Sequence, residues 1–206
     1  SSEAPSAKGS SPSSSSTSEV ISAEAASNRS AGQVEGVRFI VIDGSEATFT
    51  VREQLAKLPL PNDAVMRTKG LNGEVRLDGG QSRIDLDLQT LTSDSSSRDR
   101  YVRRRMFPGH PSATIVFGDL RPLPDGFEAG KEVSTEVTGT LSIKGVQVPL
   151  AFEIESRDDG NTVFVLGRTV FTWDQLEMPV PTARSVISVE DRVYVEVLLM
   201  LEPRGK

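Results

Sequence analysis

The strongest pattern in the sequence is the alternation in residues 133–155, VSTEVTGTLSIKGVQVPLAFEIE. Up to Ile143 every second residue is apolar or glycine, with Thr135 as the one exception, and the residues between them are polar. After a break at Lys144 and Gly145 the alternation resumes with Val148, Leu150, Phe152 and Ile154. A period of two places one set of side chains on one face of a strand. The stretch therefore predicts a β-hairpin with one buried and one solvent-facing side.

Similar runs recur along the chain and predict roughly eight strands. They occupy residues 39–42, 47–51, 71–77, 84–88, 113–117, 133–143, 148–154, 162–173 and 186–201. Glycine-rich turns separate many of them, which is typical of an antiparallel β-sandwich or β-barrel. Glu190 and Asp191 predict a turn or bulge within the last of these runs. The fold class expected from the pattern alone is all-β.

Two segments depart from the strand pattern. Pro59 and Pro61 bar a regular strand or helix, so residues 53–63 are predicted to form a loop or insertion. Residues 93–97 offer several N-cap side chains, and RDRYVRRRMF follows them. The apolar residues of that segment form one helical stripe, made of Tyr101, Val102, Met106 and Phe107. We therefore expect one short helix over residues 97–107, ended by a proline and a glycine.

The first 35 residues differ in composition from the rest. Serine occupies thirteen of the first thirty positions. Such a segment cannot bury enough surface to offset its ordering entropy, so we expect residues 1–35 to be a disordered tail or tether and residues 36–206 to form one domain. The chain begins without a methionine or an apolar signal core, as expected of a mature form from which a signal peptide has been removed. We interpret the protein as bacterial and extracytoplasmic: secreted, periplasmic or tethered to the cell envelope. The alternative is an ordinary floppy terminus.

Composition excludes several classes of function. The chain has no cysteine and a single histidine, His110, which excludes disulfides, a cysteine nucleophile and a His/Cys zinc site. A net charge of −6 does not suit a nucleic-acid partner, because phosphate contacts need clustered Lys and Arg. Asp85 and Asp87 alternate on the polar face of a strand, which favours a solvated face over a catalytic carboxylate pair. No nucleophile, phosphate-loop or dinucleotide motif occurs. We therefore predict a protein that is not an enzyme, with no metal and no cofactor.

One basic cluster stands out, at residues 98–105. Its five arginines are Arg98, Arg100, Arg103, Arg104 and Arg105. Arginine suits a phosphate or another anionic headgroup, because its planar fork donates two hydrogen bonds at once. We favour the interpretation that these arginines have a structural role or are simply solvated. In this interpretation Arg98 and Asp99 form a local pair that fixes the helix on the barrel.

Four segments together resemble the YceI-like family of extracytoplasmic polyisoprenoid-binding proteins. They are FIVIDGSEATFTV, LTSDSSSRDRYVRRRMFPGHPSATIVF, GTLSIKGVQVPLAFEI and FTWDQLEMPVP. The resemblance spans about residues 39–201, and the third segment is the most specific. It implies an eight-stranded antiparallel barrel of lipocalin-like shape, with a helix at one side and a lipid tail in the lumen.

The inward-facing apolar residues are the candidate ligand contacts. They are Phe49, Val51, Leu71, Val75, Leu86, Leu88, Ile115, Phe117, Leu141, Phe152, Val165, Phe171 and Trp173, with Leu176 and Met178 from an apolar loop at residues 176–181. With the resemblance, they favour a carrier that sequesters a long-chain isoprenoid or fatty-acid-like lipid. The alternative is a filled barrel that presents exposed apolar loops, residues 55–61 and 176–181, to a protein partner. A homodimer stays an open alternative in either case.

Overall fold

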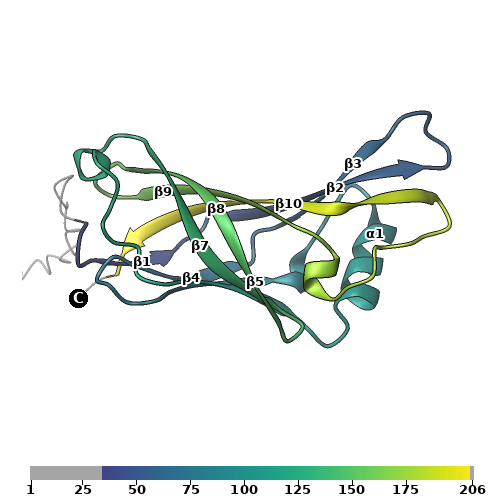
Figure 1. Cartoon of the computed structure of the whole chain (residues 1–206), viewed down its shortest axis with the longest axis horizontal. Coiled ribbons are helices and arrows are strands. Elements are labelled where there is room, and N and C mark those ends of the chain that lie inside the picture. The colour runs from purple at the N-terminus through teal and green to yellow at the C-terminus, as the bar shows by residue number, and fades with distance from the viewer. Residues whose placement is uncertain (1–33, 205–206) are drawn as a thin grey trace, which may run out of the picture.

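The computed structural model describes residues 34–204, and most of them lie in ten antiparallel strand segments (Figure 1). The segments are β1 (Arg38–Val41), β2 (Glu46–Leu55), β3 (Asn62–Thr68), β4 (Leu71–Arg76), β5 (Ser82–Asp87), β6 (Ser112–Phe117), β7 (Val133–Ile143), β8 (Val146–Asp158), β9 (Val163–Phe171) and β10 (Val186–Pro203). Short helical turns η1 (Leu88–Thr90), η3 (Phe127–Ala129) and η4 (Asp174–Leu176) lie between them. The predicted tail concerns mainly residues 1–33, which lie outside the described residues.

The ten segments close into an eight-stranded antiparallel barrel. β1 and β2 lie end to end along β10, since Val41 pairs with Leu201 and Glu46 pairs with Leu198. In the same way β3 pairs with β2, and β4 pairs with β1. β10 closes the ring, because it pairs with β9 on one side and with β1 and β2 on the other. The predicted all-β fold class and the expected barrel are confirmed.

The hairpin of β7 and β8 is the one that the alternation predicts. Ile143 pairs with Val146, which leaves Lys144 and Gly145 as a two-residue turn with positive φ angles of 52° and 83°. Two positive φ angles match the right-handed twist of the strands in such a turn. Leu141 and Ile143 are buried on one strand, and Val148, Leu150 and Phe152 are buried on the other. The apolar set therefore faces the inside of the barrel, as expected.

The prediction of a loop over residues 53–63 is wrong at both ends. β2 continues to Leu55, and β3 begins at Asn62, so the two prolines occupy only the turn between them. Inside β3, Ala64, Met66 and Thr68 are buried and alternate with more exposed neighbours. The predicted bulge in the last strand is confirmed, because the pairing of β10 with β2 shifts between Val189 and Val193.

The single predicted helix is present but changes its winding. α1 (Ser96–Tyr101) begins after the N-cap Ser95 and continues into η2 (Val102–Met106), which is a π-helical turn. The backbone amide of Phe107 donates to the carbonyl of Val102 at 3.1 Å. Val102, Met106 and Phe107 are buried, so the predicted apolar stripe does face the barrel. Among residues 34–204 no helix is long and apolar enough to cross a membrane.

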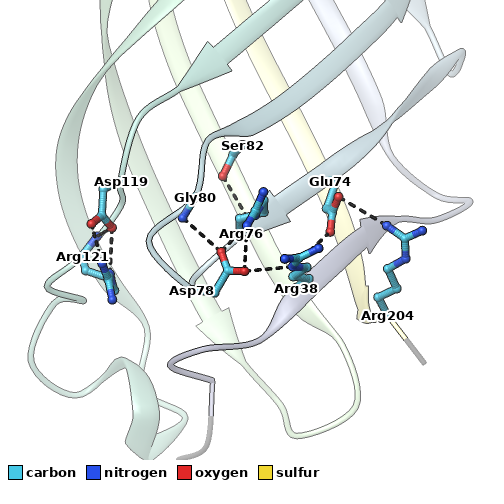
Figure 2. Close-up of polar contacts among 9 residues, drawn as sticks. All are labelled: Arg38, Glu74, Arg76, Asp78, Gly80, Ser82, Asp119, Arg121 and Arg204. Atoms are coloured by element: carbon cyan, nitrogen blue, oxygen red, sulfur yellow. Dashed lines mark hydrogen bonds and ion pairs between the residues drawn. The ribbon is translucent and has the colours of Figure 1, made fainter. Parts of the chain in front are cut away.

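A cluster of ion pairs links neighbouring strands at the barrel end where β10 ends (Figures 1 and 2). Arg38 on β1 donates to Asp78 at 2.8 Å, and Arg76 at the end of β4 holds the same carboxylate through two bonds of 2.9 Å. Glu74 on β4 pairs with Arg204, just beyond β10, at 3.5 Å. These contacts link three neighbouring strands of the ring. α1 lies at the opposite end (Figure 1).

Candidate ligand cavity

Two partly open cavities, one larger than the other, lie inside the barrel that residues 34–204 form. The larger has a volume of about 440 Å³ and lies on the side of α1 and η2, whose Tyr101, Val102 and Met106 help to line it. The smaller has a volume of about 120 Å³ and lies towards the other end, where Phe39, Leu77 and Leu201 line it. An interaction module with a filled core would need a solidly packed lumen. The two cavities show that the lumen is not packed solid.

Two aromatic rings stand where the cavities adjoin. Phe152 lines both cavities and Phe117 lines the smaller one. Their ring centroids are 5.1 Å apart at an interplanar angle of 71°, an edge-to-face contact. Ile115 also lines both cavities. Ile115 and Phe152 therefore form the wall that the two cavities share, and Phe117 packs against Phe152 on the side of the smaller cavity.

Most of the predicted contact residues do lie at these cavities. The larger cavity is lined by Phe49, Val51, Leu86, Leu88, Ile115, Leu141, Phe152, Phe171, Trp173 and Leu176. The smaller one is lined by Val75, Phe117 and Val165, together with the shared Ile115 and Phe152. Leu71 and Met178 line neither: Leu71 packs half-buried against the core, and Met178 is buried in it.

Several lining residues were missed by the sequence prediction. Ala64 and Met66 belong to β3, of which only the first two residues fell in the predicted loop, while the others were assigned to no element. Val102, Met106 and Phe107 were assigned to the buried stripe of the helix, but not to a ligand site. The stripe was the available signal, because a helix that packs its apolar face over a barrel opening contributes that face to the lumen.

The exposed apolar loop predicted at residues 176–181 is corrected by the structure. Leu176 is 2% exposed and Met178 is 6% exposed, so both belong to the core. Of the apolar residues in this segment, only Pro179 and Val180 are exposed. Leu176 becomes buried because η4 turns it inward, next to Trp173, whose indole Nε1 donates to the carbonyl of Glu190 at 3.1 Å.

A polar group interrupts the apolar wall near α1. Glu53 on β2 and Arg98 on α1 both line the larger cavity and form an ion pair of 2.8 Å. Arg98 also pairs with Asp94. The predicted pair of Arg98 with Asp99 is therefore wrong, because Asp99 instead accepts a hydrogen bond of 2.6 Å from Ser93. The helix is fixed to the barrel by a contact between elements rather than between neighbours in sequence.

The remaining arginines of the cluster fit the structural or solvated interpretation. Arg103 donates to the carbonyl of Leu91 at 3.1 Å. Arg100, Arg104 and Arg105 are exposed, and none of them pairs with a carboxylate within residues 34–204. These three side chains give the outer face of α1 and η2 a local positive charge on an acidic domain.

The side chains weighed as catalytic candidates, His110, Asp85 and Asp87, are either exposed or held in local hydrogen bonds. His110 is exposed in the segment before β6. Asp85 is engaged by Arg83 at 2.6 Å and by Thr114 at 2.6 Å; burial opposes ionisation, but these hydrogen bonds dominate and lower its pKa. Asp87 instead caps η1 by accepting from the amide of Gln89 at 2.7 Å. In the part of the chain that the structure describes, no group of three or more His, Asp or Glu side chains could hold a metal ion.

Comparison with known proteins identifies the family. The model of the YceI-like domain matches residues 40–201, and the chain therefore belongs to the YceI-like family. No protein of curated function gives a significant sequence match.

Two solved structures show the same fold. One is described as a polyisoprenoid binding domain from Saccharophagus degradans implicated in plant cell wall breakdown; it is 14% identical, with a TM-score of 0.64, over 82% of this chain and 99% of that one. The other is BcnA from Burkholderia cenocepacia, 18% identical with a TM-score of 0.56, over 76% of this chain and 95% of that one. At these levels of identity, both structures show a shared fold and nothing more.

Proposed function

We propose that the protein is a non-catalytic lipid-binding protein that holds the chain of a long isoprenoid-type lipid in the larger cavity. The observation that carries this proposal is an apolar cavity of about 440 Å³ inside a closed barrel of the YceI-like family. Each buried methylene of a ligand would contribute about 0.8 kcal/mol. The printed description of the Saccharophagus degradans domain as polyisoprenoid binding supports the same ligand class.

The proposal includes an extracytoplasmic location, with the Ser-rich stretch before the barrel as a tether. Its support lies in the sequence, where serine and other small residues dominate the first thirty positions. Such a tether would keep the barrel near a membrane from which its lipid could be drawn.

The first experiment is gentle purification, organic extraction and mass spectrometry of the extract. The matched variants are Ala64→Phe and Val65→Phe on β3. Ala64 lines the larger cavity, whereas its neighbour Val65 lines neither cavity. We expect the wild type and Val65→Phe to carry a stoichiometric apolar lipid, and Ala64→Phe to have lost most of it. No lipid in the wild type, together with no uptake of added prenols, would contradict the proposal.

A second candidate function rests on the turn between β2 and β3. Leu58 is 45% exposed and Leu60 is 71% exposed, and this hairpin projects, beside the start of β10, at the end that carries α1 (Figure 1). Exposed leucines at a projecting tip suit a protein partner. For this candidate we expect Leu60→Ser to abolish capture of the partner without changing lipid content or melting temperature. Loss of lipid uptake in Leu60→Ser would instead assign the tip to ligand loading.

A further inference from the structure

One charged residue lies in the inward-facing row of β2. Phe49, Val51, Glu53 and Leu55 alternate along this strand, and all four line the larger cavity. Glu53 is 7% exposed, so its carboxylate is placed in the wall of an otherwise apolar chamber. Burying a carboxylate is costly unless its oxygens are paired or hydrogen-bonded.

The two oxygens of this carboxylate are used unequally. Oε1 accepts from Arg98 Nη2 at 2.8 Å and from Asn62 Nδ2 at 3.2 Å. Oε2 has no hydrogen-bond partner among residues 34–204. Oε2 is not among the fully buried atoms that lack a partner, so it borders accessible space in the wall of the cavity, where water or a ligand can donate to it. A ligand in the cavity is positioned to supply that donor.

The net charge around Glu53 determines which kind of ligand headgroup can donate a hydrogen bond to Oε2. Arg98 is the cation of this group, and it is shared between two carboxylates, Glu53 and Asp94. The group as a whole therefore carries one net negative charge. A phosphate brought to it would meet like charge, whereas an uncharged hydroxyl would donate to Oε2 without electrostatic cost.

The position of Glu53 in the cavity suits a headgroup. Ser97, Thr182 and Ser185, which also line the larger cavity, are exposed and mark its mouth. Ser185 lies beside the end of β2, because its carbonyl accepts from the amide of Ala56 at 2.9 Å. Glu53 is two residues before the end of that strand, so a ligand whose polar head meets Glu53 would extend its chain towards Phe152.

We infer that Glu53 Oε2 is the acceptor for a hydroxyl on an uncharged headgroup, so that the cavity takes prenyl alcohols or prenylated phenols in preference to prenyl phosphates. This inference rests on the proposed function, and it specifies the chemistry of the headgroup that the lipid carries.

The test compares three ligands with the same C20 chain: geranylgeraniol, its methyl ether and its monophosphate. Affinities are measured by equilibrium dialysis against the wild type, Glu53→Gln and Glu46→Gln. Glu46 lies on the same strand but lines neither cavity. In the wild type we expect the alcohol to bind about tenfold more tightly than the ether or the phosphate, the value of one hydrogen bond to a charged group.

The variants separate headgroup recognition from stability. In Glu53→Gln the freed position carries an amide N–H donor instead of an acceptor, so the preference for the alcohol should fall to within about twofold. Glu46→Gln should keep the wild-type preference. Equal binding of all three ligands by the wild type would overturn the inference but leave the proposed function standing, whereas no binding of any would refute the proposed function. If Glu53→Gln weakens all three equally and keeps the ratio, Glu53 is structural and the inference is wrong.

Discussion

Phe117 on β6 and Phe152 on β8 meet edge to face across β7, with ring centroids 5.1 Å apart. The residue of β7 that pairs with Phe117 is Gly139. A Cβ atom at Gly139 would lie 2.6 Å from Phe117 and 3.1 Å from Phe152. The absence of a side chain at this position is therefore what lets the two rings meet at the wall between the cavities.

We predict that Gly139→Ala destabilises the barrel by about 1 to 3 kcal/mol, because the added methyl overpacks the aromatic pair. Gly118→Ala is the matched control, since a Cβ there would have nothing within 4 Å. Denaturant unfolding of both variants gives the comparison. Equal stability of the two would show that the rings move aside without cost.

Phe117→Ala should join the two cavities into one longer chamber. We expect the bound lipids to shift to longer chains, at a cost in unfolding free energy of about 2 to 4 kcal/mol from the lost ring. Mass spectrometry of extracted lipid gives the chain lengths. Phe164→Ala on β9 removes a ring that lines neither cavity, so its lipids should match the wild type. An unchanged length distribution in Phe117→Ala would show that the aromatic pair does not limit the chain.

The single tryptophan should report on ligand binding. Trp173 is the only tryptophan of the chain; it lines the larger cavity and is 6% exposed. An apolar chain in that cavity replaces any solvent near the indole, so we expect a saturable change in emission intensity and wavelength. Titration with a prenol measures it. A ligand that binds by dialysis but leaves the emission unchanged would occupy a site away from Trp173.

Acid should weaken the end of the barrel that carries the ion-pair cluster (Figure 2). Hydrogen bonds from Arg76 and then Arg38 hold the pKa of Asp78 well below its ordinary value of 3.8. Arg121 likewise lowers the pKa of Asp119, from 3.8 to about 2. A depressed folded pKa adds stability above the unfolded value, and that stability is lost as the pH falls from about 3.8 towards the folded pKa.

Unfolding followed between pH 5 and pH 2 tests this dependence. We expect Asp78→Asn to lose less stability over that range than the wild type, and to be the less stable of the two at pH 7. Asp125→Asn is the control, because Asp125 is exposed and forms no ion pair with another described residue. Parallel acid profiles for the wild type and Asp78→Asn would show that the cluster is not the acid-sensitive element.

Local pattern in the sequence was sufficient for most strands and for many cavity residues. Alternation in β7 and β8 correctly assigned Leu141 and Phe152 to the inner face, because side-chain direction in a strand depends only on its period of two. The stripe from Tyr101 to Phe107 identified the helix and its buried side for the same kind of reason. β3 also alternates, at Ala64 and Met66, but the two prolines before it concealed the signal.

Only the tertiary structure decided how these elements enclose space. Which strands pair, where β10 closes the ring, and how Glu53 meets Arg98 depend on residues far apart in sequence. The division of the lumen by Phe117 and Phe152 depends on Gly139, a residue of a third strand. The sequence by itself determined which side chains face inward, because that is a property of each strand. The volume left between them is set by the packing of all the strands together, and no single segment encodes it.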